Sequence, residues 1–151
     1  MNNFALMRHA KIRDNDLDPE SRGLLQSISA QFIEKLSELG PLPKFVRIFH
    51  SPRDRAKLTA IAFASALNKS GAVISAQVSG PLHWLEIEKL GVTGITDEKI
   101  ALETKGRGNT FTVFVTSAYD ILMYAGGKSP DQPPAVAYCT LWTTDFTIRG
   151  D

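Results

Sequence analysis

The sequence predicts a single α/β domain over residues 1–151: a three-layer α/β/α sandwich with a mostly parallel central sheet. Short apolar runs typical of buried strands alternate along the chain with longer segments of helical periodicity. Such alternation favours parallel strands covered by helices on both faces. No internal repeat, linker or low-complexity segment interrupts it. With 151 residues, 43% of them hydrophobic, the chain can bury roughly 70% of the surface that its unfolded form exposes.

The first strand and helix have clear boundaries. The apolar run Phe4–Met7 predicts a buried strand. Asp18 is a favourable N-cap, Pro19 suits the first helical position and Glu20 places a negative charge in the first turn. The following apolar residues recur at helical spacing, and Gly40-Pro41 ends the predicted helix.

A second strand and helix follow directly. Phe45–Phe49 predicts the strand, and the helix is expected to start at once, at Ser51-Pro52, and to stop at Gly71. Val73–Val78 predicts a weaker strand.

The C-terminal half contains the clearest strand signal, Thr110–Thr116. A short helix is expected over Ala118–Ala125, and the segment Gly126–Pro134, rich in Gly and Pro, predicts a loop. The tail Ala135–Ile148 suggests two more strands, as a hairpin at a sheet edge.

Composition restricts the classes of function. Seventeen Lys and Arg nearly balance sixteen Asp and Glu, which argues against broad binding to nucleic acid or to an anionic membrane. Cys139 is the only cysteine, and it forms no metal-ligand spacing with the three histidines, so we expect neither a metal nor another cofactor. The N-terminus shows no signal-peptide pattern and no apolar run approaches ~20 residues, so we expect a soluble, cytoplasmic protein.

Polar residues follow the predicted strands. Arg8-His9 comes after the first strand, Ser51 and Arg55 after the second, Glu86 after the third and Ser117 after the fourth. The carboxyl ends of parallel strands share one edge of the sheet, where open α/β folds bind their ligands. We therefore expect these residues to meet there.

This set of residue types is suited to phosphoryl transfer. Two arginines can hold a phosphate through planar, bidentate hydrogen bonds. A neutral histidine beside them can attack phosphorus, and a carboxylic acid can protonate the leaving oxygen. The chemistry implied is transfer through a phosphohistidine.

The same segments resemble the motifs of the histidine phosphatase superfamily, which includes phosphoglycerate mutases. Arg8-His9-Ala10 is similar to the family's Arg-His-Gly motif, and Ser51–Ala60 to its Ser-Pro-x-x-Arg-Ala-x-x-Thr-Ala signature. Glu86-Ile87-Glu88 resembles the segment that carries the proton donor, and Thr110–Ala125 the strand and helix that carry a second histidine.

The resemblance implies a role for each matching residue. His9 is the nucleophile, Arg8 and Arg55 bind the phosphoryl group, and Asn15 contacts it. Glu86 is the general acid, with its neighbour Glu88 as the alternative. The substrate would be a phosphorylated small molecule or a phosphoprotein.

The chain departs from the family pattern at Ser117. Family members have a histidine after the fourth strand, where this sequence reads Val115-Thr116-Ser117-Ala118. If Ser117 takes that place and binds phosphate, the site lacks an imidazole donor, and loss of one such donor costs about 10²- to 10³-fold in rate at oxyanion sites. Two functions therefore stay open: a phosphatase of low activity, or a catalytically impaired phosphate-binding or protein-interaction module.

Overall fold

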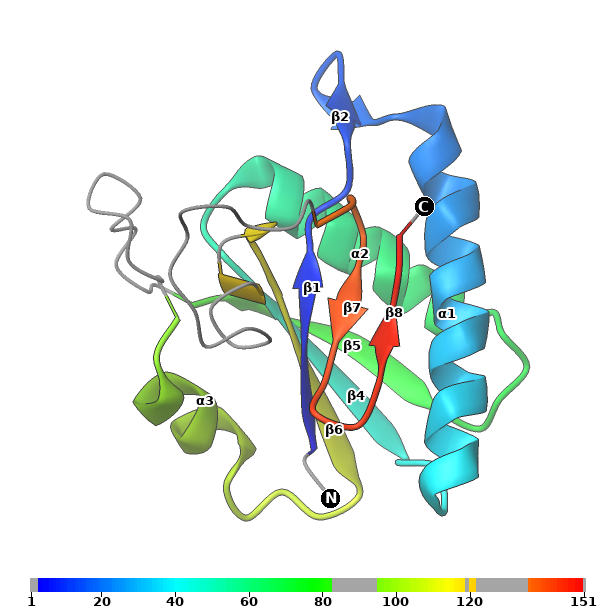
Figure 1. Ribbon diagram of the computed structural model, residues 1–151, viewed down its shortest axis with the longest axis vertical. Helices are drawn as coiled ribbons and strands as arrows, with labels where there is room; N and C mark the ends of the chain where they lie inside the picture. The colour runs from blue at the N-terminus through cyan, green and yellow to red at the C-terminus, as the bar shows by residue number, and fades with distance from the viewer. Residues whose placement is uncertain (1–2, 83–94, 119, 122–135, 151) are drawn as a thin grey trace.

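The computed structural model describes residues 3–82, 95–118, 120–121 and 136–150 of the chain, and it is α/β as predicted (Figure 1). Its centre is a six-stranded sheet in the order β5-β4-β6-β1-β7-β8. The four long strands are parallel, while β7 is antiparallel to β1 and β8 to β7. The strands are β1 (Phe4–Arg8), β4 (Phe45–His50), β5 (Ser75–Pro81), β6 (Thr110–Thr116), β7 (Leu141–Trp142) and β8 (Thr147–Ile148).

Helices cover both faces of this sheet. On one face α1 (Pro19–Leu39) and α2 (Asp54–Asn68) share a core with the strands, in which the Phe32 ring lies 5.9 Å from that of Phe63 and 5.3 Å from that of Phe111. On the other face, α3 (Asp97–Thr104) contributes Ile100 to a smaller core that includes Phe49 and Phe114. Alternate residues of the central strands point into the two cores, as period-two side chains require. These are the layers of the predicted sandwich.

The boundary signals of the first helix are confirmed. Asp18 is the N-cap, and its carboxylate accepts a hydrogen bond of 3.0 Å from the backbone N–H of Glu20. Gly40 caps the C-terminal end. The predicted C-terminal hairpin is also present, because β8 pairs with β7 and forms one edge of the sheet.

Three predicted boundaries are wrong. The second helix begins at Asp54 rather than at Ser51-Pro52, because Arg53 has extended dihedral angles (φ −77°, ψ 143°), and it ends at Asn68 rather than continuing to Gly71. The strand expected from Val73 begins at Ser75, and Val73 is 91% exposed. The extended residues before α2 matter for the site, since they carry the chain from the sheet edge to the helix.

The sequence analysis missed two elements that the structure contains. One is the hairpin of β2 (Ile12–Arg13) and β3 (Asp16–Leu17), whose connecting residues Asp14 and Asn15 both have positive φ, 54° and 64°. Two left-handed residues in succession make a type I′ turn, which Asn and Asp tolerate. The other missed element is α3.

Other predictions fall partly or wholly on residues that are not described. Residues 118, 120 and 121 are helical, in line with the expected short helix. The rest of that helix and the predicted loop at 126–134 lie outside the described residues.

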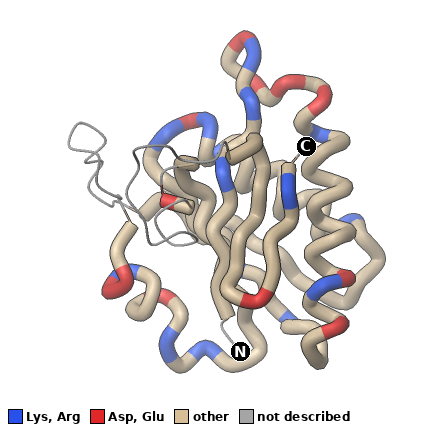
Figure 2. Tube along the Cα trace, in the orientation of Figure 1, with Lys and Arg blue, Asp and Glu red and all other residues tan. Residues whose placement is uncertain are grey.

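The charged residues are scattered over helices and loops, with little charge on the central strands (Figure 2). Within the described part of the chain, none of the helices combines the length and the apolar character needed to cross a bilayer.

Candidate functional site

The carboxyl ends of β4, β6 and β1 lie side by side and bring three predicted positions together. The backbone N–H of His9 donates to the Thr116 carbonyl at 3.1 Å, one residue past the last registered pair of β1 and β6. The N–H of Ser51 donates to the Val115 carbonyl at 3.0 Å. His9, Ser51 and Ser117 therefore start the three loops that leave neighbouring strands.

The His9 side chain is neutral and oriented. Its Nδ1 lies 3.1 Å from the Ala10 carbonyl, so Nδ1 carries the proton and Nε2 keeps a lone pair. The pKa of His9 is lowered from 6.5 to about 4: burial is the largest cause, the hydrogen bond to Ala10 opposes it, and the positive charges of Arg55, Arg8 and Arg53 add to the lowering. His9 is thus an uncharged imidazole that the positive charges of three arginines affect.

Thr59 fixes the distance between the histidine segment and the start of α2. This residue is fully buried, and its hydroxyl accepts a hydrogen bond of 2.8 Å from the N–H of Ala10. The same hydroxyl donates one of 2.7 Å to the carbonyl of Arg55. One oxygen therefore connects the residue after His9 to the backbone of the predicted phosphate ligand.

Arg8 is held by the C-terminal segment of the chain. Its Nη1 donates to the carbonyl of Val136, and its guanidinium carbon lies 4.0 Å from the centroid of the Tyr138 ring. The ring of Tyr138 is also 5.9 Å from that of His9. Tyr138 thus contacts both residues of the first motif, as a cation–π partner of one and a ring neighbour of the other.

Two arginine nitrogens at the site are buried donors that have no acceptor within the described part of the chain. Nε of Arg8 and Nε of Arg55 are inaccessible, and no described residue accepts a hydrogen bond from either. A buried unsatisfied donor costs about 1–3 kcal/mol, so an oxyanion that supplied the acceptors would bind favourably.

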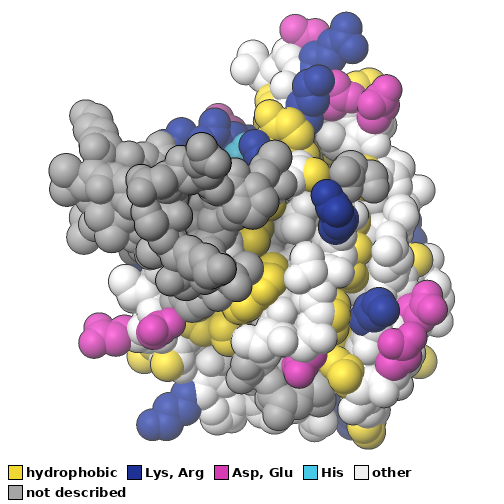
Figure 3. Space-filling view, in the orientation of Figure 1, with side chains coloured by type: hydrophobic (Ala, Val, Ile, Leu, Met, Phe, Trp, Pro, Cys, Tyr) yellow, Lys and Arg dark blue, Asp and Glu magenta, His cyan; other side chains and the backbone are white. Residues whose placement is uncertain are grey.

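Asn15 and Arg55 line an open groove of about 520 Å³ between the β2–β3 hairpin and the start of α2. Lys and Arg side chains gather beside a histidine at the upper edge of the molecule in the orientation of Figure 3. The groove residues are Ile12, Asn15, Pro52, Arg53, Asp54, Arg55 and Leu58.

The remaining predicted residues have different outcomes. Ser117 is half-buried directly after β6. Its neighbour Thr116 donates its hydroxyl hydrogen to the buried carboxylate of Asp120. Glu86 and its alternative Glu88 lie outside the described residues, so the general acid stays a prediction.

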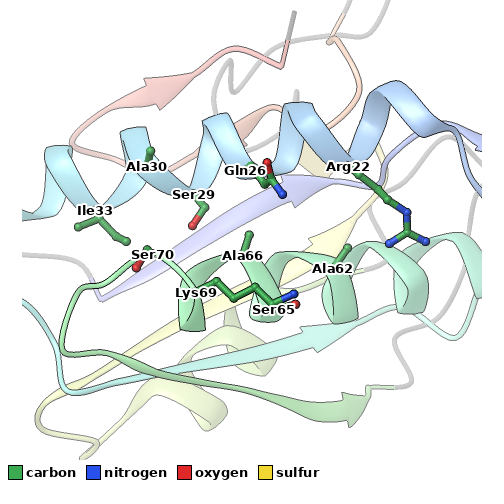
Figure 4. Close-up of a pocket in the computed structure, with 10 residues that line it drawn as sticks. All are labelled: Arg22, Gln26, Ser29, Ala30, Ile33, Ala62, Ser65, Ala66, Lys69 and Ser70. Atoms are coloured by element: carbon green, nitrogen blue, oxygen red, sulfur yellow. The ribbon is translucent and has the colours of Figure 1, made fainter.

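A larger hollow lies away from this cluster. It occupies about 620 Å³ between α1 and α2 and contains none of the predicted site residues (Figure 4). Small side chains such as Ala30, Ala62 and Ala66 form much of its lining. Although this hollow is larger than the groove, we do not take it as the functional site. The titratable and cationic groups of the predicted site lie at the carboxyl ends of the strands.

Among the described residues, no group of three or more His, Cys, Asp or Glu could hold a metal ion. Cys139 is buried, and burial raises the pKa of its thiol to about 12, against a smaller lowering by Arg8. A thiol with that pKa is not a nucleophile near neutral pH.

The chain matches no protein-family model and no curated protein. Function is therefore inferred from the geometry of the site and from the motifs themselves.

Sequence reasoning assigned no role to three residues of this cluster. Thr59 stands within the second motif, and its motif position was the one available signal. Arg53 occupies an unassigned position of that motif. Tyr138 is brought in by the pairing of β7 with β1, and its local sequence carries no signal for that contact.

We expect Thr59→Val to lower the free energy of unfolding by about 2 kcal/mol, because the buried N–H of Ala10 loses its acceptor. Thr59→Ser keeps both hydrogen bonds and should cost about 1 kcal/mol, for the lost methyl group. Urea unfolding of both variants tests this. Equal stabilities for Val and Ser would show that the two hydrogen bonds are unimportant.

The lowered pKa of His9 predicts a pH-dependent stability. Between pH 6.5 and about 4 the unfolded chain binds the imidazole proton and the folded protein does not. The contribution of His9 is therefore complete above pH 6.5, falls as the pH drops through this window and is constant below about 4. Allowing for solvent screening, the loss is on the order of 2 kcal/mol.

His9→Gln should remove this component and flatten the stability profile in that window, leaving the titration of the carboxylates unchanged. Urea unfolding at pH 7.0, 5.5 and 4.5 measures it. Parallel profiles for wild type and variant would contradict the assigned pKa.

Proposed function

We propose that this protein is a phosphomonoesterase of the histidine phosphatase type, which transfers a phosphoryl group to His9 and then to water. The observation that carries the proposal is the neutral imidazole of His9 among the charges of Arg8, Arg53 and Arg55. An oxyanion would be attracted to these cations, and the uncharged Nε2 would meet phosphorus with its lone pair available.

The two steps balance as follows. Nε2 of His9 forms a bond to phosphorus while the ester P–O bond breaks, and the leaving oxygen takes a proton, the role that the motif resemblance gives to Glu86. Water then attacks the phosphorus of the phosphohistidine and gives a proton to the carboxylate that protonated the leaving oxygen, the N–P bond breaks, and inorganic phosphate leaves. Arg8 and Arg55 would stabilise the negative charge on the phosphoryl oxygens in both steps.

We expect His9→Ala to reduce the hydrolysis of phenyl phosphate to the uncatalysed background, because the variant lacks the imidazole that attacks phosphorus. Lys35→Ala, an exposed change on α1, controls for preparation effects. With wild type, rapid quenching in alkali should trap an acid-labile phosphoprotein that His9→Ala does not form. Equal rates for wild type and His9→Ala would refute the proposal.

A phosphate-binding module without turnover is the second candidate, and the position of Ser117 favours it. Ser117 immediately follows β6 beside His9, and its hydroxyl is shorter than an imidazole and carries no charge. In such a module vanadate and phosphate would bind at the arginines, while the transition state would lack one donor.

We expect Ser117→His to raise the rate of phenyl phosphate hydrolysis by about 10²-fold, the typical effect of one oxyanion donor. Ser117→Ala is the matched control and should leave the rate within a few-fold of wild type. Vanadate affinity, measured by calorimetry, separates binding from turnover. A folded Ser117→His variant with unchanged activity would show that the serine is not what limits catalysis.

A further inference from the structure

The guanidinium of Arg8 is held by two contacts, and neither of them uses the edge formed by its Nε and Nη2. Nη1 donates to the carbonyl of Val136, and Cζ lies 4.0 Å from the centroid of the Tyr138 ring. The first contact fixes one nitrogen, and the second covers one face of the planar group. On the remaining edge, Nε is a buried donor that no described residue satisfies.

Tyr138 is itself tied to the end of β1. The N–H of Arg8 donates to the Thr140 carbonyl at 2.9 Å, and the N–H of Cys139 donates to the His9 carbonyl at 3.4 Å. The two residues that follow Tyr138 are thus bonded through their backbones to His9 and to Arg8. The position of the ring relative to Arg8 is therefore set by backbone hydrogen bonds as well as by the side-chain contact itself.

An aromatic ring can hold an arginine without reducing its ability to bind phosphate. A carboxylate in the same place would occupy N–H donors of the guanidinium and neutralise its charge. The face of an aromatic ring attracts the cation through its quadrupole, accepts none of the in-plane N–H bonds and brings no opposing charge. Tyr138 therefore orients Arg8 while the positive charge and the Nε–Nη2 edge stay available to an oxyanion.

We propose that Tyr138 is a positioning residue that acts on the reaction through Arg8: its ring holds the guanidinium in the orientation in which Nε–H and Nη2–H meet two oxygens of the phosphoryl group. This role rests on the proposed function, because the oxyanion concerned is the phosphoryl group beside His9. A guanidinium that could turn freely would still attract the substrate by its charge. It would align less well with the oxygens of the transition state, so kcat should fall more than KM rises.

The first test measures kcat and KM for phenyl phosphate in wild type, Tyr138→Phe, Tyr138→Leu and Phe45→Leu. Tyr138→Leu should lower kcat about tenfold and leave KM within about twofold of wild type, as expected for the loss of one cation–π contact. Tyr138→Phe keeps the ring face and should retain activity within about threefold. Phe45→Leu is the matched control, since Phe45 is exposed and begins β4, at the opposite end of that strand from the site.

A double-mutant cycle with Arg8→Lys shows whether Tyr138 acts through Arg8 or through the ring of His9, which lies 5.9 Å from its own. An ammonium group has no plane to orient, so in the Arg8→Lys background Tyr138→Leu should change kcat by less than about twofold. The same tenfold loss in both backgrounds would overturn the positioning role, and so would equal losses in Tyr138→Phe and Tyr138→Leu. Unfolding in urea verifies that each variant is folded, and Tyr138→Met takes the place of Tyr138→Leu if the latter is not.

Nuclear magnetic resonance separates this role from the hydrolytic function, because it follows the Nε–H of Arg8 as vanadate is added to saturation. Arg8→Lys identifies the resonance by its loss. Vanadate should shift the resonance in wild type and in Tyr138→Phe, and less than half as far in Tyr138→Leu. If no ester is hydrolysed but this pattern is seen, the hydrolytic function fails and the positioning role stands.

Two results would leave the hydrolytic function standing and refute the positioning role. One is hydrolysis of phenyl phosphate with the same kcat in wild type and Tyr138→Leu. The other is hydrolysis by a wild type in which vanadate leaves the Arg8 resonance unmoved.

Discussion

The hydroxyl of Thr59 is the contact on which the geometry of the site depends. The oxygen accepts from Ala10 and donates to Arg55, so both of its hydrogen-bonding roles are used inside the protein. A buried hydroxyl with two such partners has little freedom to move, and the spacing of His9 from the arginine is correspondingly constrained.

The site combines groups that oppose each other in the absence of a ligand. Three guanidinium charges converge, the imidazole between them stays neutral, and two buried N–H donors have no described acceptor. The two unsatisfied donors cost stability, and a compact oxyanion would supply acceptors for both of them. This is the physical reason for proposing phosphate chemistry at the site.

Local signals in the sequence predicted the elements with strong boundaries, and non-local contacts account for what was missed. Asp18 and Gly40 delimit α1 as their cap preferences require. By contrast, α3 buries only Ile100, so its periodicity is too weak to recognise. The motifs correctly predicted that His9 and Ser117 lie at the same edge of the sheet, because the carboxyl ends of parallel strands meet there. Tyr138 lies over Arg8 because β7 pairs with β1. The two residues are some 130 positions apart in the sequence, and no local pattern encodes such a contact.

The hydrogen-bond partners of Arg8 and His9 come from late in the chain, and this affects when His9 becomes ordered during folding. The N–H of Arg8 donates to Thr140, the carbonyl of His9 accepts from Cys139, and Gly150 packs so closely on Tyr138 that a Cβ there would lie 1.7 Å from its carbonyl oxygen. The strand β1 is synthesised early, whereas these partners are synthesised last. His9 would acquire its final environment only after the two ends of the chain meet, and contacts between residues so distant in sequence slow folding.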